Sequence, residues 1–365
     1  MRLSKCVIFF VLISCVFYSC GNKKESGAVT FKASSIQKKW DDRLIIDECV
    51  ALNANDSIIL STVSKCLVDN NQIIVYDKKN RRIFTYTKEG QFKCQIGREG
   101  RAKSEYLNIK DIAFSRDHTL LYVLDDIGII IYDAWTGKYV NREKIELRNF
   151  TNYWKLAILD EGHYLLFNPQ EDGLGEIVEY LEGDWKDVRK AGFYQFACER
   201  FYEYENNIRV IPSFGEFDIC TFEDGNLTPS FKFEFDNNML PTELKPKSFN
   251  EFLKTSEEGK WFSCILSAHE TSSWLYANVI GPKQTCYWVF ANKEDGGVFY
   301  GPMPTDDGMQ IVDSDSDFFY AIVYPELIGE HSYMKNVIKD KSESSNTLYL
   351  VSFHIKKKMF RHKRI

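Results

Sequence analysis

Short stretches in which β-branched and aromatic residues alternate with polar ones recur along almost the whole chain. In FKFEFD, residues 231–236, the three phenylalanines fall on one face of an extended chain, and Lys232 and Glu234 fall on the other. Ten further stretches of this kind are QIIVYD, RIFTYT, FKCQIG, LLYVLDD, GIIIYDAW, HYLLFN, FDICTF, TCYWVFA, DFFYAIVY and TLYLVSFHI. Gly, Asn and Asp separate them, so the pattern predicts an all-β protein. Only residues 246–261, PKSFNEFLKTSEEGKW, predict a helix.

Two consecutive segments of the chain repeat each other. The aligned pairs are Val75 with Val123, Asp77 with Asp125, Tyr86 with Tyr132 and Gly90 with Gly137, at separations of 46 to 48 residues. Each unit contains four predicted strands, and a four-stranded unit of this length is typical of a β-propeller blade. The later units are longer, and residues 236–260 and 326–345 are interpreted as inserted loops. We therefore expect six four-stranded antiparallel blades, with seven as the alternative, and a ring closed by pairing sequence from both ends of the chain.

The first nineteen residues are typical of an export signal. Arg2 and Lys5 precede an apolar run, residues 6–19, and Cys20 is followed by the polar stretch GNKKESG. Fourteen helical residues span about 21 Å, which is short of a hydrocarbon core about 30 Å thick. A cleaved signal peptide, residues 1–19, is therefore favoured over a permanent membrane span.

The residues around the predicted cleavage site resemble a bacterial lipoprotein box. The motif FYSC followed by GN ends at Cys20, and the resemblance implies that Cys20 becomes the diacylated first residue of the mature protein. The motif LISC, ending at Cys15, also fits the pattern and stays open as an alternative. The switch from apolar to polar sequence favours Cys20. The expected organisation is a polar tether at residues 20–35, a propeller at 36–355 and a basic tail at 356–365.

Composition and charge restrict the function further. Of the 365 residues, 44% are hydrophobic, 15% aromatic and 27% charged, which excludes a disordered chain or a polytopic membrane protein. Eight basic residues lie at the two ends, so residues 20–355 carry a charge of −14. An acidic body disfavours nucleic acid as a partner. The tail KKKMFRHKRI has two interpretations, a basic arm for an anionic membrane surface or a solvated terminus.

The cysteines do not predict a disulfide scaffold. Beyond Cys20 the mature chain has seven cysteines, an odd number, and none of them forms a CxxC pair. We expect buried free thiols that behave as small hydrophobic side chains.

Several of these segments together resemble one family. The lipoprotein-like leader, VYDKKNRRIFTYTKEGQF, IGREGRAKSEYLNIKDIAF and SNTLYLVSFHIKKK look like the six-bladed β-propeller lipoproteins of Bacteroidales, whose blades are similar to NHL and TolB-like blades. The resemblance implies a lipid-anchored protein of the cell envelope, with the outer membrane favoured and its periplasmic or surface side left open. The resemblance implies no catalytic residues in this chain.

One connecting segment is a candidate binding loop. Residues 97–106, GREGRAKSEY, connect the outer strand of one predicted blade to the inner strand of the next. Guanidinium groups suit carboxylates and a tyrosine ring suits sugars, so this loop is a candidate for an anionic or hydroxylated ligand. The candidate residues are Arg98, Arg101, Lys103, Glu105 and Tyr106. The alternative is a structural turn in which Glu105 and Tyr106 tie two blades together.

Other polar motifs predict architecture. Asp77 and Asp125 follow corresponding strands, where Asp normally accepts backbone N–H bonds in a turn. The run DSDSD, residues 313–317, resembles a calcium loop but has Phe318 and Tyr324 where glycine and glutamate are required. The six histidines are scattered without zinc-site spacing, and no nucleophile elbow or phosphate loop is present.

These observations predict no cofactor and favour a non-catalytic binding or scaffold module for a glycan, a peptide or an envelope protein. The alternative is a propeller enzyme, a lactonase-like hydrolase or a lyase, that holds a divalent ion in the axial channel with side chains from several blades.

Overall fold

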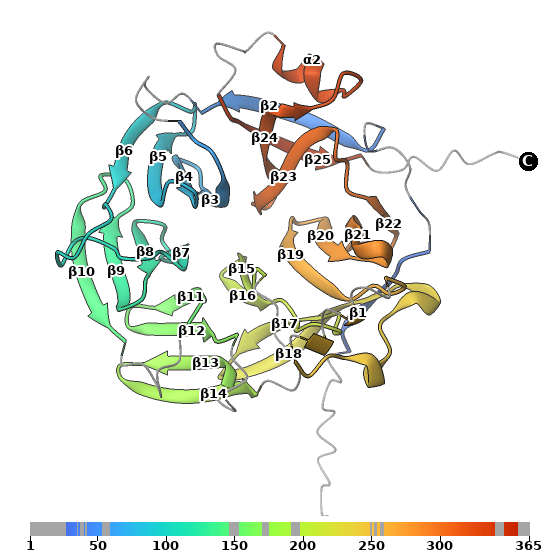
Figure 1. Cartoon of the computed structure of the whole chain (residues 1–365), viewed down its shortest axis with the longest axis horizontal. Helices are drawn as coiled ribbons and strands as arrows, with labels where there is room; N and C mark the ends of the chain where they lie inside the picture. The colour runs from blue at the N-terminus through green and yellow to red at the C-terminus, as the bar shows by residue number, and fades with distance from the viewer. Residues whose placement is uncertain are drawn as a thin grey trace, which may run out of the picture.

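A computed structural model describes residues 27–34, 36, 40, 42–52, 59–145, 153–169, 175–190, 198–248, 250–251, 254–255, 259–339 and 347–356. Six β-sheets are arranged radially around one axis, and each sheet follows the previous one along the chain (Figure 1). The protein is a six-bladed β-propeller with four-stranded antiparallel blades, which confirms the predicted fold class.

The first strand of each blade lies next to the axis. Blade 1 contains β3 (Val63–Val68), β4 (Gln72–Asp77), β5 (Arg82–Thr87) and β6 (Phe92–Ile96). Blade 2 contains β7 (Asp111–Phe114), β8 (Leu120–Leu124), β9 (Gly128–Asp133) and β10 (Tyr139–Lys144). Blade 3 contains β11 (Lys155–Asp160), β12 (His163–Phe167), β13 (Gly175–Leu181) and β14 (Asp184–Lys190).

The other three blades follow the same plan. Blade 4 contains β15 (Phe201–Tyr204), β16 (Asn207–Val210), β17 (Asp218–Glu223) and β18 (Asn226–Glu234). Blade 5 contains β19 (Cys264–Glu270), β20 (Trp274–Ile280), β21 (Cys286–Asn292) and β22 (Val298–Pro302). Blade 6 contains β23 (Asp307–Ser314), β24 (Phe319–Ile328) and β25 (Tyr349–Ile355), and its outermost strand is β2 (Leu44–Ala51).

Both ends of the chain contribute to blade 6, which closes the ring. Strand β2 pairs antiparallel with β25, with Leu44 opposite Ile355 and Ala51 opposite Tyr349. The inner strands β23 and β3 are in contact, so the last blade also meets the first (Figure 1). The predicted closure by sequence from both ends is therefore confirmed.

The first described strand of the chain joins a different blade. Strand β1 (Val29–Lys32) pairs in parallel with β18 and makes blade 4 five-stranded. Phe31 is fully buried and its ring lies 5.9 Å from that of Phe231 and 5.7 Å from that of Phe233. The propeller therefore recruits residues from the stretch that the sequence assigns to the polar tether.

The sequence repeat corresponds to structurally equivalent positions. Tyr86 on β5 and Tyr132 on β9 are both buried in the core clusters between blades. Gly90 and Gly137 occupy the turns after these strands with φ of 81° and 68°. A positive φ favours glycine, which explains why both turns contain this residue.

Helices are few. Asn250, Glu251, Lys254 and Thr255 are helical, as predicted for residues 246–261. Short 3₁₀ turns occur at Asp236–Asn238, Thr242–Leu244 and Pro282–Gln284. The segment interpreted as a loop at residues 326–345 begins with the end of β24 and contains helix α2 (Met334–Ile338), whose Met334 and Ile338 pack on blade 6 (Figure 1). In the described parts of the chain, no helix is long and apolar enough to cross a membrane.

The structure does not test the predictions about the two ends of the chain. The signal peptide, Cys15, Cys20 and residues 357–365 of the basic tail lie outside the described residues.

Candidate functional site

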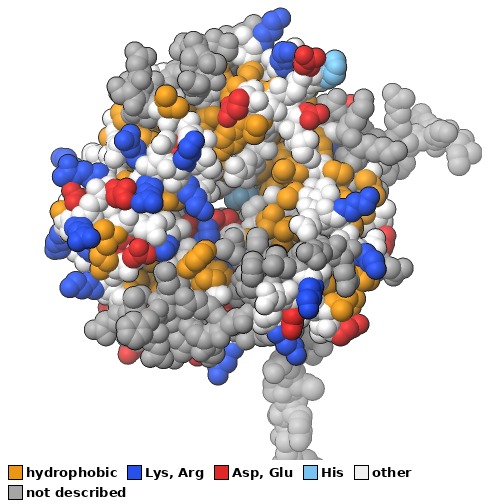
Figure 2. Space-filling model, in the orientation of Figure 1, with side chains coloured by type: hydrophobic (Ala, Val, Ile, Leu, Met, Phe, Trp, Pro, Cys, Tyr) orange, Lys and Arg blue, Asp and Glu red, His pale blue; other side chains and the backbone are white. Residues whose placement is uncertain are grey.

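A cavity of about 490 Å³ lies on the propeller axis, and all six inner strands contribute to its wall. Figure 2 shows a hollow at the centre of the face in view, with acidic and basic side chains and a histidine at its edge. The charged and histidine side chains that line the cavity are Lys65, Asp69, His118, Glu199, Glu203, Glu205, His269, Asp313 and Asp315. This volume is in the range of pockets that hold small organic ligands.

The cavity opens on the face formed by the turns that follow the inner strands. Asn70, His118, Asn206 and Ser316 lie in the turns after β3, β7, β15 and β23, and all four line the cavity. Because the blades repeat by rotation about the axis, these turns share one face and the segments that precede the inner strands share the other. The polar turns therefore form the mouth of the cavity.

Deeper in the molecule, ion pairs join side chains from four blades. The Lys65 ammonium of blade 1 lies 2.9 Å from Asp111 of blade 2 and 3.7 Å from Glu199, which precedes β15 of blade 4. Glu199 also pairs with Lys155 of blade 3. The second oxygen of Asp111 accepts the backbone N–H of Leu156 at 3.0 Å. The network fixes the spacing of four inner strands around the axis.

The charges in this network stabilise one another. Burial opposes the charge on Lys155, but Glu199 and Asp111 outweigh that cost and raise the pKa of Lys155. Burial similarly disfavours the carboxylate of Glu199, but Lys155 and Lys65 outweigh it and lower its pKa. Lys155 and Glu199 are therefore both ionised at neutral pH.

His269 is a buried imidazole on β19 that lines the cavity. Its side chain is 9% exposed, and its ring lies 6.2 Å from those of Tyr202 and Tyr276. Burial lowers the pKa of His269 to about 4, although Glu199 acts in the opposite direction, and Lys65 adds a smaller effect in the same direction as burial. Within the described part of the chain, its ring nitrogens have no hydrogen-bond partner. A neutral imidazole that faces a cavity offers one donor and one acceptor to a ligand.

Two carboxylates near the mouth lack a cationic partner. Asp313 on β23 accepts the backbone N–H groups of Val68 at 2.7 Å and Ser314 at 2.9 Å. Burial raises the pKa of Asp313 to about 7, although these bonds and Lys65 act in the opposite direction. Burial also raises the pKa of Glu203 on β15, although His118 and Arg116 act in the opposite direction. Neither carboxylate lies within 4.0 Å of a basic nitrogen of a described residue.

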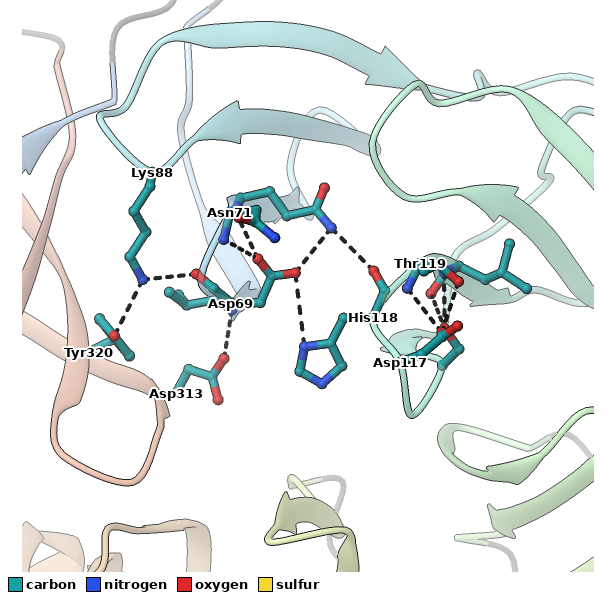
Figure 3. Close-up of polar contacts among 12 residues, drawn as sticks. Asp69, Asn71, Lys88, Asp117, His118, Thr119, Asp313 and Tyr320 are labelled. Carbon is teal, nitrogen blue, oxygen red and sulfur yellow. Dashed lines mark hydrogen bonds and ion pairs between the residues drawn. The ribbon is translucent and has the colours of Figure 1, made fainter.

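Asp69 lies between blades 1 and 2 at the mouth (Figure 3). It accepts the backbone N–H groups of Asn71 at 2.6 Å and Gln72 at 2.8 Å, and lies 3.9 Å from His118. Lys88 donates to the backbone oxygen of Asp69 at 2.9 Å. Figure 3 shows that contacts among neighbouring turns, from different blades, hold these polar groups in place.

A second hollow adjoins the first on the outer side of these turns. It has a volume of about 720 Å³ and shares Asp69, Asn70 and His118 with the axial cavity. Trp135, which is half-exposed, forms part of its wall, and the Lys93 ammonium lies over the indole ring. The axial cavity thus continues towards the rim between blades 1 and 2.

The wall between the polar groups is apolar and largely aromatic. Phe114, Phe201, Tyr276, Trp288 and Ile311 line the cavity, and each of them is also part of the hydrophobic core. Packing within the core fixes these side chains, so the cavity is preformed.

The predicted binding loop lies at the other end of the inner strands. Residues 97–106 precede β7, whereas the cavity mouth follows it. Glu105 pairs with Arg98 at 2.6 Å and accepts the backbone N–H of Ala102 at 2.9 Å, and Tyr106 is fully buried. Arg101 and Lys103 are exposed.

None of the five predicted residues is among the described residues that line the axial cavity. Arg98, Glu105 and Tyr106 instead make hydrogen bonds within the loop, in the case of Tyr106 through its backbone. Ligand contact by this loop stays a prediction.

The turn aspartates have the predicted architectural role. Asp77 accepts the backbone N–H groups of Ser61 at 2.8 Å and Thr62 at 3.3 Å, and Asp125 accepts that of Ile127 at 2.8 Å. In DSDSD, Asp315 accepts the backbone N–H groups of its own turn. Among the residues that the structure describes, no group of three or more His, Cys, Asp and Glu is arranged to hold a metal ion.

Sequence reasoning missed the residues that gather around the axis. Lys65, Glu199, Glu203 and His269 are single polar residues within or next to strands, and each belongs to a different local context. The one sequence signal is the polar turn after each inner strand, such as VDNNQ at residues 68–72. A blade alignment that marked these turns would have indicated the mouth of the cavity.

The fold and the preformed axial cavity define a six-bladed β-propeller with a ligand-sized site at its centre. A protein-family model described as a domain of unknown function, DUF4934, matches residues 47–348, and the chain belongs to this family. No curated protein matches the chain.

Two solved structures are similar to this fold. One is a protein described as exported, from Bacteroides fragilis NCTC 9343, with 15% identity, a TM-score of 0.76 and coverage of 90% of this chain and 100% of the other. The second is a DUF4221 family member from Bacteroides vulgatus ATCC 8482, with 11% identity, a TM-score of 0.61 and coverage of 86% and 98%. At these identities the likeness shows the fold.

Proposed function

We propose that this protein is a lipid-anchored binding module of the cell envelope and that it holds its ligand in the axial cavity without chemical conversion. The observation that carries the proposal is the preformed cavity, which has aromatic walls and inward-facing polar groups from several blades. Candidate ligands are a peptide, a glycan fragment or an exposed segment of an envelope protein.

The state of the polar groups supports binding over catalysis. Asp111 and Glu199 are held by lysines, and Asp313 and Asp69 by backbone N–H groups. Carboxylates that are fixed in this way position a ligand but leave no paired acid and base on one reacting atom.

The location is proposed from the leader and the relatives. The signal-like residues 1–19 and the lipoprotein-like motif at Cys20 imply export and acylation, and one structural relative is described as an exported protein. Two or more acyl chains anchor a protein stably in a bilayer. We expect Cys20→Ala to abolish acylation and release the protein into the soluble periplasmic fraction, as measured by metabolic labelling with a palmitate analogue. Acylation that persists on this variant would move the anchor to Cys15.

The binding proposal is tested by filling the cavity. Ser64 lines the cavity from β3 and is partly exposed to it, so Ser64→Trp places an indole in the ligand's space. A panel of peptides and glycan fragments is screened by thermal shift, because a ligand that binds only the native state raises its melting temperature. We expect hits on the wild type that are lost in Ser64→Trp. Hits that bind both proteins equally would contradict the axial site.

A further inference from the structure

The cavity lining is strongly acidic. Six carboxylates and one lysine line it, and the lysine, Lys65, is already paired with Asp111 and Glu199. Low-dielectric walls strengthen the field of such groups, so the cavity attracts positive charge.

The carboxylates differ in how many ion pairs and hydrogen bonds within the protein stabilise their negative charge. Glu199 has two lysine neighbours, and Asp69 and Asp315 accept several N–H bonds within their own turns. Asp313 has only backbone donors, and Glu203 has neither a hydrogen bond nor an ion pair to a described residue. These two carboxylates come from blades 6 and 4, which places them on different sides of the axis.

The raised pKa values of Asp313 and Glu203 are consistent with this lack of compensating hydrogen bonds and ion pairs. Burial is the main cause for both groups, so their carboxylate forms are under-stabilised in the free protein. A cation that enters the cavity would stabilise them.

His269 is an independent indication of a ligand. Its imidazole is nine-tenths buried, faces the cavity and lacks a hydrogen-bond partner among the described residues. Because the imidazole faces the cavity, its hydrogen-bond partner comes from outside the chain, and a ligand can take the place of water there. Beside it, Tyr276 and Trp288 provide aromatic surface, which favours an apolar body and contributes attraction to a cation.

We infer that the axial cavity binds a ligand that carries an ammonium or guanidinium group on an apolar body, such as the basic side chain of a peptide. Asp313 and Glu203 supply the carboxylates that attract the cation, His269 hydrogen-bonds the polar part, and the aromatic wall covers the apolar part. This inference rests on the proposed binding function and specifies the class of its ligand.

The test uses three matched probes on the full mature chain with Cys20 replaced by Ala. They are acetyl-Lys-Tyr-amide, its neutral norleucine analogue and its anionic glutamate analogue, with tyramine as a free amine. Isothermal titration should show that the lysine peptide binds about tenfold or more tightly than the norleucine peptide, with the glutamate peptide weakest. Tyramine binding as tightly as the peptide would identify a free amine as the ligand source, and weaker binding would identify a peptide.

Variants assign the cation site. Asp313→Asn and Glu203→Gln should each weaken binding of the lysine peptide about tenfold and leave that of the norleucine peptide unchanged. Asp317→Asn is the matched control, because Asp317 is exposed in the turn next to Asp313 and does not line the cavity. Its affinity for the lysine peptide should equal that of the wild type.

Different results would overturn the axial site and the cationic class of ligand. Norleucine or glutamate peptides that bind as tightly as the lysine peptide, and lose binding in Ser64→Trp, would overturn the cationic class and keep the axial site. Absence of binding by every probe would also overturn the cationic class. Binding of the lysine peptide that survives in Ser64→Trp would overturn the axial site itself.

Discussion

The ammonium nitrogen of Lys65 lies 2.9 Å from a carboxylate oxygen of Asp111 on the neighbouring blade. Asp111 also accepts the backbone N–H of Leu156 on the blade after that. One carboxylate thus links the inner strands of three blades, and the network continues to a fourth through Glu199. Contacts of this kind fix the ring around the axis and so define the shape of the cavity.

Removal of Asp111 should destabilise the ring strongly. Asp111 is 2% exposed, so Asp111→Ala leaves the largely buried Lys65 without its nearest partner, at a cost of about 3–5 kcal/mol in the free energy of unfolding. Glu99→Ala is the control, because the Arg81–Glu99 pair is more than half exposed and such pairs contribute only about 0–1 kcal/mol. Urea denaturation measures both, and equal effects would refute the structural role of the network.

The fifth strand of blade 4 should be an integral part of the fold. Phe31→Ala removes a fully buried ring from a cluster that includes Phe231 and Phe233. Such truncations cost about 3–5 kcal/mol. Thr30→Ala, on the exposed face of the same strand, should change stability by less than about 0.5 kcal/mol. A Phe31→Ala variant as stable as the wild type in urea would show that β1 is detached in solution.

Asp313 should give stability a distinct pH dependence. The pKa of Asp313 is raised to about 7 in the folded protein, whereas an unfolded aspartate titrates near 3.9. The folded state therefore binds more protons between these values, and this contribution to stability falls as the pH rises from about 4 to 7. Lys65 and Asp315 face this group, and the buried thiol of Cys66 is also close to it.

His269 contributes to the pH dependence of stability in the opposite direction. Its folded pKa of about 4 means that the unfolded state binds more protons below about pH 6.5, so stability falls as the pH decreases. Comparison of Asp313→Asn with the wild type cancels the effect of His269. Between pH 4 and 8 the variant should gain about 2–4 kcal/mol relative to the wild type in urea denaturation. A difference that does not change with pH would contradict the raised pKa of Asp313.

Tyr106, in the loop of residues 97–106, should have a structural role. Tyr106→Ala should cost about 3–5 kcal/mol because its ring is fully buried between blades 1 and 2. Tyr106→Phe keeps the ring, and the hydroxyl has no hydrogen-bond partner among the described residues, so it should be nearly neutral. Thermal melts report both values. A severe effect of Tyr106→Phe would mean that the hydroxyl has an essential partner.

The sequence predicted the fold because its signals are local. Two-residue alternation marks most strands, and equivalent turns repeat the same chemistry, as Asp77 and Asp125 show. Strand β1 escaped prediction because it has only four residues, and its parallel partner β18 lies about two hundred residues later in the chain. No local pattern encodes a pairing of that kind.

The cavity could not be predicted for a related reason. Among the described lining residues, the number of polar groups differs from blade to blade, from none on blade 3 to several on blades 1, 4 and 6, and the groups differ in type, from Lys65 on β3 to His269 on β19. Spacing along the chain therefore carries no signature of the site, and only closure of the ring brings the groups together. The loop with Arg101 and Lys103, in contrast, has contiguous polar residues, which give a local signal in the sequence.

Ligand binding in the axial cavity can be tested by one titration. Acetyl-Lys-Tyr-amide is titrated into Ser64→Trp and into the Arg101→Ala/Lys103→Ala double variant, both of which must show the melting cooperativity of the wild type. We expect Ser64→Trp to weaken binding by about tenfold or more, whereas the double variant keeps the wild-type Kd. Retained binding in Ser64→Trp together with loss in the double variant would rule out the axial cavity and place the site on the loop of residues 97–106.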